Sequence, residues 1–255
     1  MASRVVLITG GAGGIGSATA RILVARGDRV VLFGRREEPL QKLATELGDS
    51  AIAYSGDATR LEDLEAAVER AVDAFGSLDG TAHCVGSIQL KSLHLTSVDT
   101  FVETLETNLI SAFLACKASL GVMRKQNRGS IVLLSTAAVR QGMNNHEIIA
   151  AAKGGIEGLV RSAAMTYARY GVRFNCVAPG LTETPLAEPL LRSDANRAVS
   201  ESLHPLGRVG RAEEVAGVIA YLLGDDAAWI TGQTWGVDGG LAAGIAPPRI
   251  VRSTT

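Results

Sequence analysis

The sequence predicts a single α/β domain with a doubly wound parallel sheet of about seven strands and helices on both faces. Short runs of consecutive apolar residues, typical of strands buried on both faces, alternate with longer segments whose apolar residues recur at helical spacing. The chain has 255 residues, of which 47% are hydrophobic, and this suits one large core better than two small ones. We therefore expect one domain over residues 1–246 and a loose tail over residues 247–255.

The first strand ends in a glycine-dense turn. The apolar run at residues 5–8 leads into TGGAGGIG at residues 9–16, after which the apolar spacing becomes helical. Glycine lets the backbone turn tightly and approach a pyrophosphate, and the free N–H groups of the following helix face the anion. The turn therefore predicts a dinucleotide phosphate loop. An ordinary loop is the alternative while this segment is taken alone.

The end of the second strand bears on which dinucleotide binds. The apolar residues 30–33 are followed by Gly34, Arg35 and Arg36, where an acidic residue would hydrogen-bond the 2′-hydroxyl of NAD. A guanidinium grips phosphate in a bidentate way, so Arg35 favours NADP, with NAD as the other possibility. The alternative is that both arginines are solvated and simply begin a surface helix.

The alternation of strands and helices continues to the end of the domain. Glycines close the helices, and each following apolar run is short enough for a buried strand. The pattern predicts helices at 37–46, 61–75, 105–123, 147–170 and 213–223, and strands at 51–55, 80–84, 130–134, 172–177 and 234–237. No repeat or low-complexity segment interrupts this order.

Residues 181–203 lose this periodicity directly after the segment Ala178, Pro179 and Gly180. A loop that follows a strand end lies at the ligand edge of a parallel sheet. We expect residues 181–203 to form a substrate lid.

Composition excludes several classes of function. The net charge of −1 and a pI near 6.4, with basic residues scattered among acids, give no surface for nucleic acid. Cys84, Cys116 and Cys176 are far apart and lack metal spacing, so we expect buried thiols, a reducing compartment and no metal. No run approaches the length of a membrane span, and the first strand begins too early for a signal peptide. These features predict a cytoplasmic protein without membrane contact.

Five separated stretches together make the chain similar to the short-chain dehydrogenase/reductase family, a group of single-domain Rossmann folds. They are the loop at residues 9–16, Asp57, Asn108, Lys153 with Pro179-Gly180, and the C-terminal stretch at residues 232–240. The resemblance runs from residue 5 to residue 240 and is strongest to 3-oxoacyl-thioester reductases and small alcohol dehydrogenases. Together with the Arg35 argument, it implies a cofactor site made of Thr9, Gly10, Gly14, Ile15, Gly16, Arg35, Asp57, Gly86, Lys153, Pro179, Gly180 and Thr184. The implied substrate is a small carbonyl compound or alcohol.

The chain departs from the family pattern at two places. The family's Asn-Asn-Ala-Gly is replaced by HCVG at residues 83–86, which keeps the glycine. The family's Tyr-x-x-x-Lys is also broken, because counting back from Lys153 places Ile149 at the tyrosine position. In the family that tyrosine donates a proton to the carbonyl oxygen, and isoleucine cannot do so.

The resemblance implies that the remaining catalytic positions are kept. Asn108 and Lys153 match the family's relay residues, Thr136 lies at the position of the substrate-polarising serine, and Ser135 lies beside it. His146, about one helical turn before Ile149, is the best candidate for a substitute acid, since an imidazolium donates a proton near neutral pH. Glu147 is the second choice. The alternative for His146 is a capping or loop residue without chemistry.

Three functions remain open on the sequence. The chain is an enzyme with a substitute acid, or a weak or inactive NADP-binding subunit that partners an active homologue, or an NADP-responsive binding protein. The family commonly forms tetramers through two long helices, here at residues 105–123 and 147–170, so we expect a homotetramer or a hetero-oligomer. Residues 87–95 and the lid after Thr184 would line the substrate pocket.

Overall fold

The computed structural model describes residues 3–244 and contains one seven-stranded parallel sheet. Its order is β3-β2-β1-β4-β5-β6-β9. The strands are β1 (Val5–Thr9), β2 (Arg29–Gly34), β3 (Ala51–Ser55), β4 (Gly80–His83), β5 (Gly129–Leu134), β6 (Val172–Pro179) and β9 (Thr234–Val237). This confirms the predicted fold class, and the loose tail expected at residues 247–255 lies outside the described residues.

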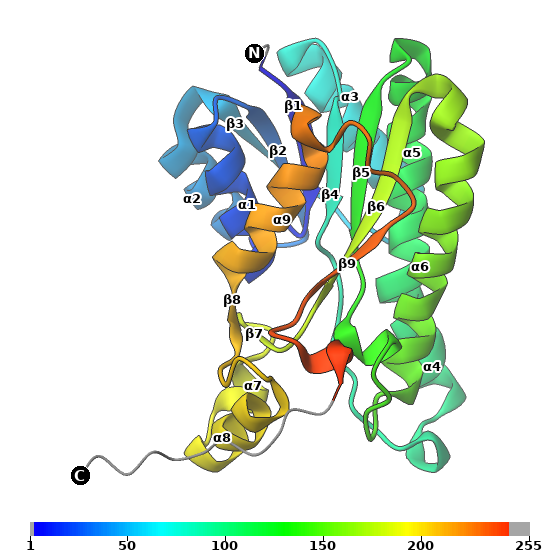
Figure 1. The fold of residues 1–255 in the computed structure, drawn as a ribbon. Helices are drawn as coiled ribbons and strands as arrows, with labels where there is room; N and C mark the ends of the chain where they lie inside the picture. The colour runs from blue at the N-terminus through cyan, green and yellow to red at the C-terminus, as the bar shows by residue number, and fades with distance from the viewer. Residues whose placement is uncertain (1–2, 245–255) are drawn as a thin grey trace.

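Helices cover both faces of the sheet (Figure 1). On one face lie α1 (Gly14–Ala25), α2 (Glu37–Leu47) and α9 (Ala212–Leu223). On the other lie α3 (Leu61–Phe75), α4 (Val98–Leu105), α5 (Ser111–Gln126) and α6 (Glu147–Tyr167). Successive residues of a strand point to opposite faces, so Val6 and Ile8 enter one core while Val5 and Leu7 enter the other. Every residue of β1 is therefore buried.

The strand order reverses at β1, which pairs with β2 on one side and β4 on the other. In open parallel sheets such a reversal leaves a crevice outside the carboxyl ends of the strands, where ligands bind. The register places Thr9, the last residue of β1, opposite both Phe33 and His83. The glycine loop and the segment after β4 therefore leave the sheet side by side.

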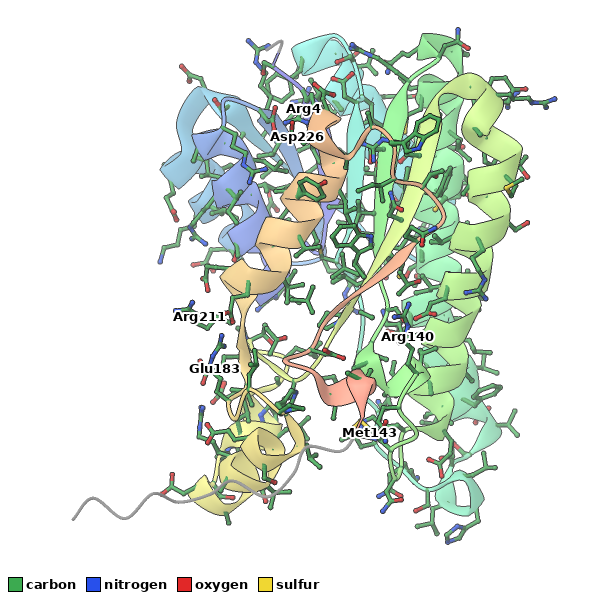
Figure 2. The ribbon with its side chains drawn as sticks, in the orientation of Figure 1. Arg4, Arg140, Met143, Glu183, Arg211 and Asp226 are labelled. Carbon is green, nitrogen blue, oxygen red and sulfur yellow. The ribbon has the colours of Figure 1, made fainter. Side chains whose placement is uncertain are left out.

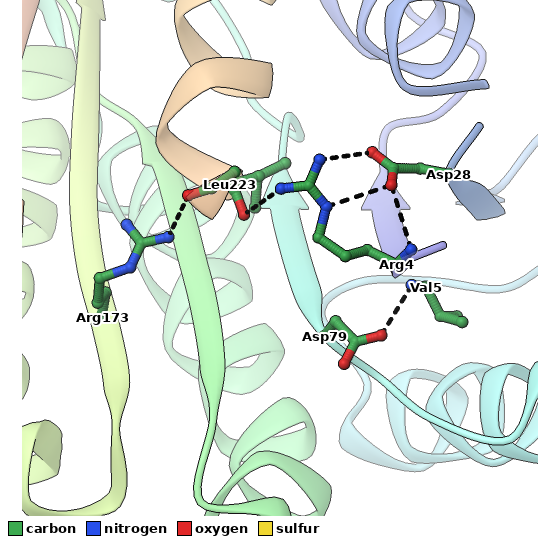
Figure 3. Close-up of polar contacts among 7 residues, drawn as sticks. Arg4, Val5, Asp28, Asp79, Arg173 and Leu223 are labelled. Carbon is green, nitrogen blue, oxygen red and sulfur yellow. Dashed lines mark hydrogen bonds and ion pairs between the residues drawn. The ribbon is translucent and has the colours of Figure 1, made fainter. Parts of the chain in front are cut away.

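Two arginines bind the end of α9 at the amino ends of the strands, opposite the crevice (Figure 3). Arg4 donates to the carboxylate of Asp28 and, at 3.4 Å, to the carbonyl oxygen of Leu223 at the end of α9. Arg173 from β6 donates to the carbonyl oxygen of Leu222 at 2.8 Å. Cations at a helix C-terminus satisfy its free carbonyl groups and its dipole. These contacts fix α9 against the sheet, far from the crevice.

The structure departs from the expected elements at two places. The predicted helix at residues 105–123 belongs to a longer helical segment, in which α4 passes through a π-helical turn, Glu106–Ile110, into α5. Residues 181–203 contain regular structure: β7 (Thr182–Glu183), α7 (Glu188–Leu191) and α8 (Asp194–Leu203). β7 pairs with β8 (Gly210–Arg211), so the segment leaves and rejoins the domain at one place (Figure 1).

Candidate active site

The glycines of the loop at residues 9–16 lie where the backbone packs too closely against neighbouring backbone for a side chain to fit. Gly10 has φ +70°, and a methyl group on it would lie 2.9 Å from the carbonyl carbon of Cys84. A methyl group on Gly16 would collide with the carbonyl oxygen of Gly10. Gly13 precedes α1 without a side-chain cap, which leaves the first N–H groups of the helix free for an anion. The loop therefore fits the pyrophosphate of a dinucleotide.

Thr184 closes over this loop from the start of the lid segment. A methyl group on Gly14 would lie 2.6 Å from Cγ2 of Thr184. The Thr184 hydroxyl accepts a hydrogen bond from the N–H of Ala187, and the carbonyl oxygen of Thr184 accepts from Ala187 and Glu188. Thr184 thus links the phosphate loop to the approach of α7.

The predicted adenosine end lies where β2 and β3 finish. Asp57 accepts hydrogen bonds from the backbone N–H and the hydroxyl of Thr59, each at 2.9 Å. These bonds and the nearby Arg35 guanidinium hold the pKa of the Asp57 carboxyl below its ordinary value. Arg35 itself is exposed, which leaves its guanidinium accessible to a phosphate group.

His83, the first departure from the family pattern, joins the cofactor loop to the π-helical turn. Its Nδ1 lies 2.8 Å from Oγ1 of Thr9 and its Nε2 lies 3.1 Å from Oγ of Ser111. Ser111 donates to the carbonyl oxygen of Thr107, so it accepts from Nε2–H, and Thr9 donates to Nδ1. Burial lowers the pKa of His83 to about 3, so the ring stays neutral. His83 thus provides one donor and one acceptor at a position where the family has an amide.

Asn108 is fully buried in the π-helical turn. Its Oδ1 accepts from the N–H of Ser87, and its Nδ2 donates to Oγ of Ser87 and to the carbonyl oxygen of Thr104. A methyl group on Gly86 would lie 3.0 Å from Oδ1 of Asn108 and 3.2 Å from Nζ of Lys153. The structure thus brings Gly86, Asn108 and Lys153 together.

Lys153 is 6% exposed and lines the cavity described below. Burial lowers the pKa of its ammonium group to about 8, and the group therefore remains mostly charged at neutral pH. Burial also raises the pKa of the neighbouring thiols Cys84 and Cys176 to about 12. Those thiols are neutral, and thiols are nucleophilic only as thiolates. Cys84 is half-buried, although the sequence predicted a buried thiol.

Ser135 and Thr136 differ in what their hydroxyl groups already bind. Ser135 donates to Oε1 of Glu157, a buried carboxylate on α6, at 2.8 Å. The Thr136 hydroxyl accepts a bond from the N–H of Ala138 at 3.4 Å, so its own proton stays available. Both residues line the cavity, but Thr136 is the better placed to donate to a substrate oxygen. Glu157 carried no signal in the sequence.

Ile149 and His146 occupy the first turn of α6 and the position just before it. Ile149 is 6% exposed, lines the cavity and lies one helical turn before Lys153. His146 makes no side-chain capping bond. Its Nδ1 lies 2.7 Å from the carbonyl oxygen of Asn144 and must carry a proton to donate to it. The ring also lines the cavity, and Nε2 is the nitrogen that this bond leaves available.

These residues surround one cavity of about 490 Å³. Besides Ile15 at the start of α1 and the catalytic candidates, its walls include aliphatic residues from the segment after β4 and from the lid segment. The predicted residues that line it are Ile15, Gly86, Ser135, Thr136, His146, Ile149, Lys153, Pro179, Gly180 and Thr184. Thr9 and Asn108 lie behind this wall through the contacts given above, whereas Arg35 and Asp57 lie at the adenosine end. Within residues 3–244, no cluster of ligand side chains could hold a metal ion.

Sequence reasoning missed His204, which lies at the end of the lid segment. It is 3% exposed, its Nδ1 donates to the carbonyl oxygen of Ser200 and its Nε2 accepts from the N–H of Leu181. It therefore ties α8 to the turn after β6. Figure 2 shows Glu183 and Arg211 on the paired strands β7 and β8, and Met143, which lines the cavity, beyond the carboxyl ends of the central strands.

Comparison with known proteins decides the family. The family model described as "Enoyl-(Acyl carrier protein) reductase" matches residues 10–242. A solved structure of a short-chain type dehydrogenase/reductase from Mycobacterium ulcerans superposes with a TM-score of 0.90 at 28% identity and covers 96% of this chain and 92% of that one. The chain belongs to the short-chain dehydrogenase/reductase family. A second structure of this fold, a variant of the actinorhodin polyketide ketoreductase with NADPH, has a TM-score of 0.90 at 30% identity, covering 94% of this chain and 97% of that chain.

Two curated relatives are dehydrogenases of alicyclic alcohols. A cis-4-hydroxycyclohexanecarboxylate dehydrogenase from Sinomonas cyclohexanicum is 38% identical over 245 residues, covering 95% of this chain and 98% of the relative. A cyclohexanol dehydrogenase from Acinetobacter sp. strain SE19 is 36% identical over 241 residues, covering 93% and 94%. The short-chain dehydrogenase/reductase fold thus extends over almost the whole chain. Within the described residues, none of the helices has the length and apolar character needed to cross a membrane.

Proposed function

We propose that the protein is an NADP-dependent oxidoreductase that interconverts an alicyclic secondary alcohol and its ketone. The observation that carries this proposal is the meeting of Gly86, Asn108 and Lys153 at one end of a cavity that Thr136 and His146 also line. The names of the two curated relatives support a cyclohexane-ring alcohol as substrate, and they differ in whether that ring carries a carboxylate. The lid segment, with α7 and α8, would cover this substrate.

The residues present fit a nicotinamide dinucleotide. The N–H groups at the start of α1 would hold the pyrophosphate, Asp57 the adenine end, and Thr184 with Pro179 and Gly180 the nicotinamide end. Lys153 would hold the nicotinamide ribose. When bound, the cofactor supplies a hydride to the ketone carbon or accepts one from the alcohol carbon.

A side chain of the protein must then donate one proton, because reduction of a ketone also protonates its oxygen. Thr136 donates a hydrogen bond that orients and polarises this oxygen. His146 donates the proton as an imidazolium, in which Nδ1–H stays bonded to the carbonyl oxygen of Asn144 and the proton on Nε2 is the one transferred. In the oxidation direction the same nitrogen accepts the proton from the alcohol. Glu147, exposed on the same turn, is the second candidate.

Arg35 sets the preference for NADP over NAD in this proposal. Arg35→Asp removes the group that binds the 2′-phosphate and adds a repelling carboxylate, so we expect NADPH affinity to fall by about tenfold to hundredfold. NADH affinity should stay equal or improve. Fluorescence titration with both cofactors measures the two dissociation constants. Arg26→Asp, at an exposed residue after α1, is the matched control, and equal or tighter NADH binding by the wild type would contradict the NADP assignment.

An oligomer of the family type is the second part of the proposal. The helical segment through α4 and α5 leaves five large apolar side chains exposed: Val98, Phe101, Val102, Ile110 and Phe113. Such a surface on a helix pair suits burial against another copy of the chain or against a homologue. The same surface, together with isoleucine at the tyrosine position (Ile149), is what supports the alternative of an inactive subunit that partners an active homologue. Light scattering of the purified protein, followed by identification of any co-purifying chain, separates the homotetramer from the hetero-oligomer.

A further inference from the structure

We infer that the substrate pocket is built for an uncharged, largely apolar ketone or alcohol and rejects one whose far end carries a carboxylate or phosphate. This inference rests on the proposed function and refines its substrate. It is carried by the aliphatic part of the cavity wall. Its side chains come from the segment after β4, from the loop before α6 and from the lid segment: Ile88, Leu90, Met143, Leu186, Leu190, Val199 and Leu203.

Charged groups are scarce around the cavity. Among the described residues that line it, none is Asp, Glu or Arg, and the ionisable ones are Lys153 and two histidines besides the thiol Cys84. Lys153 lies at the cofactor end, beside Gly86 and Asn108. Both ring nitrogens of His204 are engaged by backbone groups. The proposed function places His146 at the reacting oxygen, so an acidic group at the far end of a substrate would find no further cationic partner in this wall.

Two arginines of the lid region are already bound to carboxylates. Arg197 from α8 donates to Oε1 of Glu183 at 2.5 Å and also lies near Glu201. Arg208 forms two hydrogen bonds with Glu214. Using either arginine to bind an acidic substrate would require breaking an existing ion pair. The polar side chains that the lid segment places in the cavity wall are uncharged: Thr182, Thr184, Asn196 and Ser200.

The lid also leaves apolar surface to be covered. Leu186, Val199 and Leu203 line the cavity and yet are 52%, 63% and 47% exposed. An apolar substrate body would remove this surface from water, which is favourable in proportion to the area covered. A carboxylate in the same place would lose its hydration without gaining a partner. The lack of a free cationic partner and the exposed apolar surface thus favour the same class of substrate, an uncharged apolar one.

The test compares two ligands that differ in one group. Cyclohexanone and 4-oxocyclohexanecarboxylate share the reacting ketone, and only the second carries a carboxylate, on the ring carbon across from the carbonyl group. With saturating NADPH, we expect kcat/KM to be at least about a hundredfold higher for cyclohexanone, because the buried carboxylate stays unpaired. Equal or higher kcat/KM for the acid would overturn the inference.

A gain-of-function variant sharpens the test. Leu190 of α7 lines the cavity, is half-buried and has no part in the proposed chemistry. Leu190→Arg should lower the ratio of kcat/KM for cyclohexanone to kcat/KM for the acid by about tenfold or more, because the arginine gives the carboxylate a partner. Leu190→Gln, the matched uncharged control, should leave this ratio unchanged. If both variants leave the preference unchanged while the wild type accepts the acid, the pocket selects on something other than charge and the inference fails.

Equilibrium binding separates this inference from the proposed function. Both ligands are titrated into the protein–NADPH complex, with cofactor fluorescence as the readout. Binding of cyclohexanone in preference to the acid, without turnover, supports the pocket inference while the proposed reaction fails. Binding of neither ligand, or preferred binding of the acid, overturns the inference whether or not the protein turns over another ketone.

Discussion

His146→Asn is expected to lower kcat for ketone reduction by about 10² to 10⁴, the usual contribution of a positioned proton donor. Asparagine keeps a polar side chain beside Asn144 but cannot deliver a proton. The affinity for NADPH should stay within about twofold, because the side-chain hydrogen bond of His146 goes to Asn144 and not to the glycine loop. The loss should therefore appear in kcat and not in cofactor binding.

Steady-state kinetics and an NADPH titration on the same preparation check this result. His94→Asn is the matched control, since His94 is exposed on the short helix Leu93–Leu95 and does not line the cavity. Glu147→Gln tests the second candidate acid. Turnover by His146→Asn at the wild-type rate would show that His146 is only a loop residue and that another group donates the proton.

Ile149→Tyr in the His146→Asn background is expected to restore kcat by about tenfold or more. Ile149 already lies in the cavity wall one helical turn before Lys153, so a tyrosine there would project from the same position. The neighbouring Lys153 ammonium would lower the pKa of the new phenol and make it a better acid. The cavity, Asn108 and Thr136 need not change for this rescue.

Ile149→Phe in the same background separates chemistry from packing. Phenylalanine has nearly the size of tyrosine but no hydroxyl group, so it should give no rescue. The pH dependence of kcat should also differ between the rescued variant and the wild type, because a phenol and an imidazole titrate in different ranges. Equal activity of the Tyr and Phe variants would mean that the side chain acts only by filling space.

The sequence predicted those parts of the site that local chemistry determines. The run at residues 5–8 indicated a buried strand because it contains no polar residue, and the glycines at 10 and 16 indicated the tight turn in which they pack against neighbouring backbone. Asn108 and Gly86 were each expected in the site through the family resemblance, but their contact was not predicted. Ile149 as a departure in the cavity wall was visible only through that resemblance.

The remaining features depend on contacts between segments that lie far apart in the chain. The π-helical turn at Glu106–Ile110 has no distinct periodicity over five residues. His204 looks like an ordinary loop residue until the fold brings Leu181 to its ring, and Glu157 looks like a helix-surface acid until Ser135 lies against it. The lid helices α7 and α8 have only four and ten residues, too few for a helical period to stand out along the sequence.

The measurement that tests the central claim most directly is the consumption of NADPH by the purified wild-type protein with cyclohexanone. We predict turnover in which each NADPH consumed yields one cyclohexanol, despite isoleucine at residue 149. Tight NADPH binding without consumption, across cyclohexanone and a panel of other ketones and acyl thioesters, would contradict this claim and would favour a binding subunit over an enzyme.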